Sequence, residues 1–281
     1  MDTHRAASPD YLSHTEGEHP AGLASSGRPR RLVPSAPARP ITAAGPRAVQ
    51  PTERDRRLVA VAVRHGRLGP SQAWRWEWPA SPTIRPAWNR LSELASAGWL
   101  RHVPLRCGGG VYVTTPAGGF LVRDRTDGLA APKAPADGAG RWLAQLGHDL
   151  TVAEVERWLL RRAPVGARFL TERELVREWV RSLPPRLRHG AAGMRFRPDG
   201  AVVLPSGERI AVEVELHAKG AERLGEKLRW YRDEAGYVEV LWLVFPAGVE
   251  EPLWAAIAGV DPKADLMAVE RLPPECLVYA R

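Results

Sequence analysis

Hydrophobic and polar positions in the first half of the chain predict three helices followed by a hairpin. Apolar residues recur at helical spacing from Thr52 to His65, with Thr52 as the N-cap, and again from about Thr83 to Ala97. Between them, the segment Pro70 to Trp78 predicts a short helix that starts with proline, as helices tolerate. Trp99 to Leu105 and Val111 to Thr114 predict two strands on either side of a glycine-rich turn.

Two capping boxes predict helices in the second half of the chain. Thr151-x-x-Glu154 and Thr171-x-x-Glu174 each precede a run with apolar residues at helical spacing. We therefore expect one helix to begin after Thr151 and another after Thr171.

The rest of the second half predicts a mixed sheet with flanking helices. Ala201 to Leu204 and Ile210 to Leu216 alternate as strands do, and the polar segment Pro205 to Glu208 joins them. Val238 to Phe245 is almost continuously apolar, as expected for a strand covered on both faces. The remaining expected elements are a helix from Gly220 to Glu234, a helix from Pro252 to Ala258 and an edge strand from Leu266 to Arg271.

Composition divides the chain into four segments. Residues 1–51 are rich in Pro, Ala and Arg and have few large apolar residues, which predicts a disordered head. Residues 52–123 have the plan of a winged helix-turn-helix domain. Residues 124–140 have the composition of a linker, and residues 141–281 would form the second domain. The expected fold class is α/β, or α+β overall.

The charge favours a polyanionic partner. The net charge is +8 and the pI is about 10.1, so nucleic acid is the first candidate. Only four of the 40 basic residues are lysines, and arginine suits phosphates and guanine edges. A genome-wide preference for arginine would give the same composition, so the charge supports double-stranded DNA as a partner without establishing it.

The third helix would be the recognition helix of a winged helix. In that case Arg85, Asn89 and Arg90 would meet the major groove. Three further residues flank the predicted wing, where phosphate or minor-groove contacts are made: Arg101, His102 and Arg106. The alternative is that this helical module packs against protein.

Three acidic residues indicate a metal site. Asp199 stands at the entrance of the Ala201 strand, and Glu213 and Glu215 lie two positions apart, on one face of the next strand. Carboxylates that are so close repel each other unless a cation lies between them, and Mg²⁺ or Mn²⁺ takes such oxygen ligands. The alternative is a solvated face on which the glutamates pair with arginines of the hairpin region: Arg195, Arg197 and Arg209.

These acids carry a resemblance to known families. Pro198-Asp199 and Glu213-x-Glu215 resemble the Pro-Asp … (Asp/Glu)-x-Lys signature, PD-(D/E)XK, of the restriction-endonuclease-like superfamily. The longer run that ends at Leu228-Arg229-Trp230-Tyr231 resembles the replication-relaxation family of mobile-element proteins, over roughly residues 53–245. That family pairs an N-terminal winged helix with a nuclease-like domain, and it is similar to some mobilisation relaxases of plasmids.

One position departs from the signature. Glu215 stands where the superfamily has a lysine that helps to position or deprotonate the attacking water. Lys219 follows four residues later and could reach back. The residues expected to carry catalysis are therefore Asp199, Glu213, Glu215 and Lys219, the first three as ligands of the metal.

Accessory groups are also candidates. His148 precedes the Thr151 capping box and could reach the acids as a ligand or a proton carrier, although a structural histidine is the alternative. Glu154 or Glu156 could add a carboxylate from a helix.

The resemblance implies a DNA-binding protein that acts in plasmid or mobile-element replication or transfer, as a metal-dependent nickase or endonuclease. Replication or transfer proteins of the element would be further partners. The alternative is a winged-helix transcriptional regulator, or an accessory factor, whose nuclease-like domain is inactive.

Several function classes are excluded by missing motifs. The chain has no Gly-x-x-x-x-Gly-Lys loop, no Cys-x-x-Cys pair and no two histidines at the spacing of tyrosine relaxases. It also lacks a bilayer-spanning apolar run and the apolar segment of a signal peptide, so we expect a cytoplasmic protein with no membrane partner.

Overall fold

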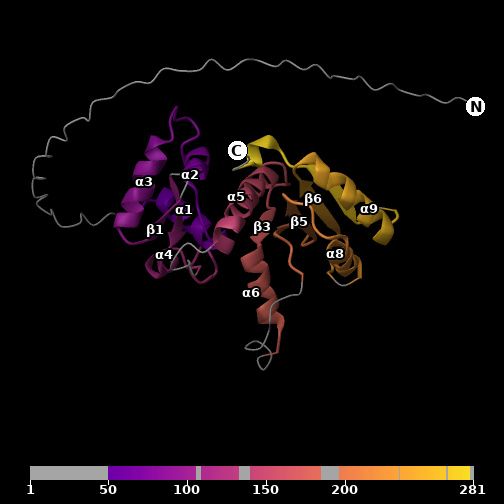
Figure 1. Ribbon diagram of the computed structural model, residues 1–281. Helices are drawn as coiled ribbons and strands as arrows, with labels where there is room; N and C mark the ends of the chain where they lie inside the picture. The colour runs from indigo at the N-terminus through magenta and orange to yellow at the C-terminus, as the bar shows by residue number, and fades with distance from the viewer. Residues whose placement is uncertain are drawn as a thin grey trace, which may run out of the picture. The chain divides into compact units, whose positions relative to one another are not determined.

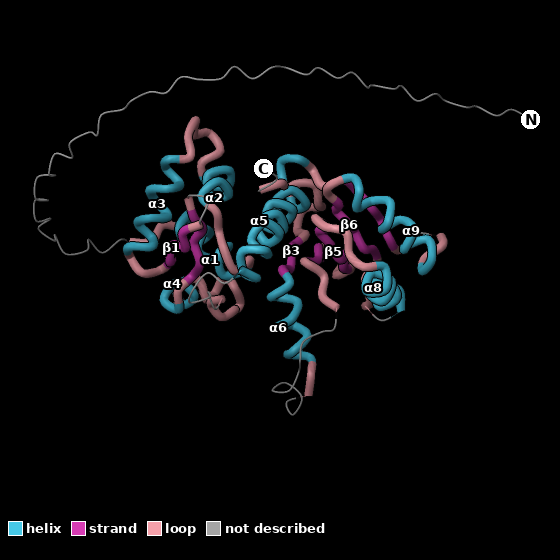
Figure 2. The backbone as a smooth tube through the Cα atoms, viewed as in Figure 1, coloured by secondary structure: helices cyan, strands magenta, loops and turns pink. Residues whose placement is uncertain are grey.

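The computed structural model describes residues 50–105, 109–132, 140–184, 196–233, 235–263 and 265–278. All of these residues belong to one compact unit. They form a mixed α/β protein, which confirms the expected fold class at this level (Figures 1 and 2). The predicted head, residues 1–51, lies outside the described residues except for its last two.

The first part of the chain has the predicted order of elements. Helices α1 (Glu53–Arg64), α2 (Pro70–Glu77) and α3 (Arg85–Ser96) precede the antiparallel strands β1 (Leu100–Pro104) and β2 (Gly110–Thr114). Thr52 caps α1 in a capping box with Asp55, as predicted for the N-cap. Gly98 follows α3 with a φ of +79°, a conformation that favours glycine after a helix end.

A single core joins these elements. Leu58 of α1, Leu91 and Leu94 of α3 and Tyr112 of β2 are all buried in it. A short helix, α4 (Pro116–Leu121), extends the part beyond the hairpin.

The second part is built on a five-stranded mixed sheet with the order β3-β4-β5-β6-β7. The pairs β3–β4 and β4–β5 are antiparallel, whereas the pairs β5–β6 and β6–β7 are parallel. The strands are β3 (Arg168–Thr171), β4 (Gly200–Val203), β5 (Arg209–Glu215), β6 (Glu239–Val244) and β7 (Met267–Arg271). Its helices are α5 (Gly140–Leu160), α6 (Glu172–Ser182), α8 (Ala221–Asp233) and α9 (Glu250–Val260), with the short 3₁₀ helices η1 (Ala247–Val249) and η2 (Pro274–Cys276).

Helices cover both faces of this sheet (Figure 1). On one face Val212 and Val214 pack in a core with residues of α5. On the other face Ala211 and Trp242 pack in a core with residues of α8 and α9. Burial on both faces explains the continuous apolar run of β6.

The Thr151 capping box is a wrong prediction. Helix α5 already begins at Gly140, so Thr151 lies in its interior and is buried there. The pattern was misleading because a threonine and a glutamate three residues apart also fit the inside of a helix. The Thr171 capping box is confirmed: its hydroxyl accepts from the N–H of Glu174, whose carboxylate accepts from the N–H of Thr171.

Part of the predicted linker, residues 124–140, packs onto the first part of the chain. Thr126 is buried, and Leu129 belongs to the core of α1 and α3. Asp127 also binds Arg177 and Arg181 of α6. Composition predicted a linker here, whereas the described part of the segment is held by buried Thr126 and Leu129 and by the ion pairs of Asp127. Residues 133–139 lie outside the part that the structure describes.

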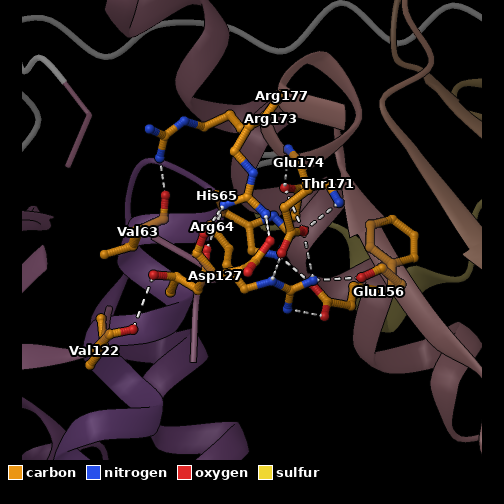
Figure 3. A network of polar contacts seen from close by, with 12 residues as sticks. Val63, Arg64, His65, Val122, Asp127, Glu156, Thr171, Arg173, Glu174 and Arg177 are labelled. Atoms are coloured by element: carbon orange, nitrogen blue, oxygen red, sulfur yellow. Dashed lines mark hydrogen bonds and ion pairs between the residues drawn. The ribbon is translucent and has the colours of Figure 1, made fainter. Parts of the chain in front are cut away.

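Buried charges tie the helical part to the sheet part (Figure 3). Arg64, at the end of α1, pairs with Glu156 at 2.5 Å and with Glu174 at 3.0 Å, and it donates to the carbonyl of Phe169. His65 also pairs with Glu156. Burial alone would raise the pKa of the Glu156 carboxyl, but Arg64 and His65 lower it to about 2.

Candidate functional site

Asp199 immediately precedes β4 and lies at the end of the sheet where β5 finishes. Gly200 is paired with Val212, so the antiparallel register carries Asp199 towards Glu213 of β5. The N–H of Val214 donates to Asp199 Oδ2 at 2.8 Å. The N–H of Glu172 donates to the backbone carbonyl of Asp199 at 3.2 Å. The aspartate is therefore held by two other segments of the chain, β5 and the start of α6.

His148 of α5 meets this aspartate. Its Nε2 lies 3.2 Å from Asp199 Oδ2 and 3.1 Å from the carbonyl oxygen of Val214. Burial opposes protonation of the ring, but the charges of Asp199 and Asp149 outweigh it and raise the pKa of His148 to about 11. Burial would likewise raise the pKa of the Asp199 carboxyl, and His148 lowers it below its usual value.

Glu213 lies next to Asp199 and is buried, with 1% of its surface exposed. Lys227 of α8 pairs with it at 2.6 Å, and the hydroxyl of Tyr231 donates to its other oxygen. Burial and the charge of Asp199 raise the pKa of Glu213, whereas Lys227 acts in the opposite direction. The carboxylate thus has a cation and a hydroxyl donor, both from α8.

Glu215 is also buried, and Lys219 pairs with it at 2.5 Å. Lys219 does reach back to the strand, as predicted. Burial disfavours its charge, but Glu213 and Glu215 raise the pKa of Lys219. Each of the two strand glutamates therefore has its own lysine.

The solvated-face interpretation of these glutamates is wrong, because neither is exposed. Two of the arginines proposed as partners bind other acids: Arg197 pairs with Glu172 and Arg209 with Glu178. The third, Arg195, lies outside the described residues.

The predicted accessory carboxylates lie away from this site. Glu154 pairs with Arg75 of α2, and Glu156 belongs to the Arg64 network described above. Glu172 is nearer to the site. Burial raises the pKa of the Glu172 carboxyl, and the negative charge of Asp199 raises it further.

The donors that converge differ from the predicted ligand set. In the part of the chain that the structure describes, no three Asp, Glu, His or Cys side chains are arranged as a metal site. Asp199 Oδ2, the Val214 carbonyl and His148 Nε2 come together instead. His148 Nε2 lies 3.2 Å from Asp199 Oδ2 and 3.1 Å from the Val214 carbonyl oxygen, which are hydrogen-bonding distances.

Two cavities meet at His148. The first has a volume of about 380 Å³, and its wall includes Asp199, Glu172 and the arginines Arg173 and Arg197. The second has a volume of about 700 Å³ and lies at the carboxyl ends of β5 and β6, where its wall includes Glu215 and Phe245. Ligands of sheets with parallel strands commonly bind at such strand ends.

The predicted recognition helix presents only part of its predicted contacts. Arg85 and Asn89 are exposed on α3. Arg90 instead binds Asp55 with two nitrogens, at 2.7 and 2.5 Å, and also pairs with Glu93. Asp55 is buried, so Arg90 serves to neutralise a charge in the core rather than to face a groove. The sequence did not show this because the two residues are far apart along the chain.

The predicted wing is described in part. Arg101 and His102 are exposed on β1, and the ring of His102 lies 5.1 Å from that of Tyr112 and 6.2 Å from that of Trp88. Arg106 lies outside the described residues.

Sequence reasoning missed Lys227 and Tyr231 and gave His148 only an accessory place. Lys227 and Tyr231 are four residues apart and so share a face of α8, which the helical spacing could have shown. The partner that this face meets depends on the crossover from β5 to β6, which the pattern did not specify.

None of the described helices has the length and apolar character needed to cross a bilayer. Comparisons of the chain with protein-family models, with curated proteins and with solved structures find no match, so the site must be interpreted from its own geometry.

Proposed function

We propose that this chain binds double-stranded DNA and cleaves or nicks it with a divalent metal, in the replication or transfer of a plasmid or other mobile element. The first part would be a winged helix and the second a nuclease-like domain, acting in the cytoplasm. The observation that carries the proposal is the convergence of Asp199, His148 and the Val214 carbonyl next to the buried Glu213.

The topology of the sheet supports this interpretation. Strands β4 and β5 are antiparallel neighbours. Asp199, which precedes β4, therefore lies at the same end of the sheet as Glu213 and Glu215, near the end of β5. This is the arrangement that the PD-(D/E)XK resemblance implies.

Asp199, the Val214 carbonyl and His148 would hold Mg²⁺ or Mn²⁺. Imidazole is a better ligand for Mn²⁺ than for Mg²⁺, so this donor set favours Mn²⁺. A bound metal would lower the pKa of a water and stabilise charge on the attacked phosphate. His148 can bind a metal only without a proton on Nε2, so the metal and the His148–Asp199 ion pair exclude each other.

Lys227 is proposed to replace the lysine that the signature lacks. Its ammonium group forms an ion pair with the carboxylate of Glu213, and its charge also lowers the pKa of Asp199. Glu215 cannot provide this charge, and Lys219, at 34% side-chain exposure, is held by Glu215. In this role Lys227 would orient Glu213 and face the developing charge of the phosphate.

DNA would be held by the exposed side of α3 and by the hairpin. Arg85 and Asn89 are available there for a major groove, and Arg101 and His102 for a backbone or minor-groove contact. Arg90 is left out of this set because it is committed to Asp55.

A regulator or accessory factor without cleavage is the second candidate. Lys227 and Lys219 neutralise the two strand glutamates, as expected where a nuclease-like domain has kept its fold and lost its metal. Both candidates bind DNA, and they differ in metal-dependent cleavage.

A nicking assay on supercoiled plasmid DNA distinguishes them. We expect nicks that require Mn²⁺ or Mg²⁺ and that disappear with Asp199→Asn or His148→Ala. Asp233→Asn is the matched control, because Asp233 is an exposed acid that pairs with its neighbour Arg232 on α8. DNA binding without nicks in any metal would leave the regulator, and absence of DNA binding would exclude both candidates.

A further inference from the structure

The second cavity at His148 has no part in the proposed metal chemistry. Its volume of about 700 Å³ lies within the range of about 300–1,000 Å³ that is usual for small-molecule pockets. It shares His148 and Gln145 with the first cavity, and His148 contacts Asp199. A group bound in the second cavity therefore lies beside the acidic site and can belong to the same molecule as the attacked phosphate.

One side of this cavity is apolar and aromatic. Three of its residues belong to the core that packs β5 against α5: Val214, Leu216 and Leu277. Phe245 follows β6, and its N–H donates to the carbonyl of Glu215 at 2.9 Å, which continues the parallel ladder. Because side chains alternate along a strand, Phe245 lies on the same face as Leu243, the face that α5 covers. The Phe245 ring lines the cavity and is 36% exposed, so it is available for stacking.

The wall that α5 provides contains a glycine inside the helix. Gly147 lies in the interior of α5, where glycine is among the least favourable residues. Close packing does not account for it, because a Cβ added at Gly147 would meet no atom of the described residues within 4 Å. The open space beside this glycine allows a ligand to approach the helix backbone next to His148.

Polar groups complete the wall of the cavity. They are Thr151 of α5 and three residues at the end of β5 and beyond it: Glu215, His217 and Lys219. The side chain of Lys219 is 34% exposed, so it presents a positive charge to a polyanion beside the cavity. A cavity with an aromatic ring on one side and polar groups on the other fits a nucleobase, which has π-faces for stacking and polar edges for hydrogen bonds.

We infer that the second cavity binds one nucleobase of the DNA substrate, unpaired and turned out of the duplex, with the Phe245 ring stacked on its face. The base belongs to a nucleotide next to the phosphate at Asp199, because His148 lines both cavities. This inference deepens the proposed function and rests on its DNA binding but not on cleavage. A base that is already mispaired enters more readily, because less pairing and stacking must be broken.

The preference for a mispaired base tests this inference. Binding to a short DNA duplex with one central mismatch is compared with binding to the same duplex fully paired. Fluorescence anisotropy measures both affinities, with chelator present so that cleavage is absent. The parent should bind the mismatched duplex about 10-fold more tightly than the paired one.

Two variants should lose this preference by different routes. Phe245→Ala removes the stacking ring and should weaken binding to the mismatched duplex by about 10-fold, with little change for the paired duplex. Gly147→Leu places a side chain in the open space beside the helix and should have the same effect. Leucine is a better helix former than glycine, so Gly147→Leu should unfold at a temperature no lower than that of the parent.

Two matched controls lie on α9, which covers the other face of the sheet. Trp254→Ala removes an aromatic ring that is 40% exposed, close to the exposure of Phe245. Gly259→Leu adds the same side chain at another helical glycine with open space around it. Both controls should keep the parent's preference for the mismatched duplex.

The outcomes separate this inference from the proposed function. Equal affinity of the parent for the two duplexes, or an unchanged preference in Phe245→Ala and Gly147→Leu, would overturn the inference and leave the proposed DNA binding in place. If deoxyadenosine monophosphate alone bound the parent more tightly than the mismatched duplex does, the cavity would be a site for free nucleotides, and the inference would again be overturned. Absence of binding to either duplex would overturn both proposals.

Discussion

At the scale of single residues, the candidate site depends on the contact between His148 and Asp199. They come from segments 51 positions apart and form a charged pair beside the Val214 carbonyl. A histidine in this position can have two states, an imidazolium paired with the aspartate or a neutral ligand of a metal. Proton and metal would therefore compete for one group.

The His148 pair predicts a particular dependence of stability on pH. The folded-state pKa of His148 is raised to about 11 from an ordinary value of 6.5, so its contribution is full below about pH 6.5. It should be lost as the pH rises from there towards 11. In metal-free urea denaturation, the parent should lose more free energy of unfolding than His148→Gln between pH 7 and pH 10. Parallel curves for the two proteins would show that the pair does not form.

Mn²⁺ should bind more tightly as the pH rises, because a metal on His148 replaces the proton. Calorimetric titration should show weaker Mn²⁺ binding at pH 6 than at pH 8, with protons released on binding. Equal affinity at both pH values would mean that His148 is not a ligand.

At the scale of an element, α3 has both a structural and an exposed side. Arg90 points back to α1, where Asp55 is buried and also completes the capping box of Thr52. Arg85 and Asn89 are on the exposed side. Arginines five residues apart on one helix thus have different tasks, which the charge pattern could not separate.

This division predicts unequal effects of two similar substitutions on stability. Arg90→Ala should leave the Asp55 carboxylate without its charged donor and lower the free energy of unfolding by about 2 kcal/mol. Arg85→Ala should change stability by less than about 0.5 kcal/mol, since its side chain is exposed and has no ion pair in the described residues. Urea denaturation measures both. If Arg90→Ala were as stable as the parent, the Asp55 contact would not be structural.

At the scale of the whole molecule, the described residues form one unit rather than two parts on a flexible linker. The Arg64 network joins α1 to α5 and α6, and Arg173 of α6 donates to the carbonyls of Val63 and Ala130 (Figure 3). The helical part and the sheet part are therefore held together by buried ion pairs and hydrogen bonds.

Removing Arg64 should weaken this connection. Arg64→Met leaves the buried Glu156 and Glu174 without their main cation, at a cost of about 3–5 kcal/mol. We expect thermal unfolding to split from one transition into two, because each part keeps its own core. Arg271→Met, which removes an exposed arginine paired with Glu250, should unfold like the parent. A single transition at the parent's temperature would indicate that Arg64 does not join the parts.

The sequence by itself determined most of the elements. The three helices and hairpin of the first part, the β4–β5 hairpin, α8 and the buried strand β6 all follow from local patterns, because apolar period and turn residues are properties of neighbouring positions. A local pattern that fits two structures gave a wrong prediction: the Thr151 capping box suits both the start and the interior of a helix, and Thr151 lies in the interior of α5. Leu129 likewise packs in a core although its surroundings have the composition of a linker.

Only the tertiary structure decided which charges meet. The sequence identified Asp199, Glu213 and Glu215 as a group and put Lys219 within reach of the strand, but only the fold pairs His148 with Asp199 and Lys227 with Glu213. The fold likewise committed Arg90 to Asp55. The physical reason is that an ion pair depends on distance in space, and the strand pairing and helix crossovers that set this distance join segments up to about a hundred residues apart.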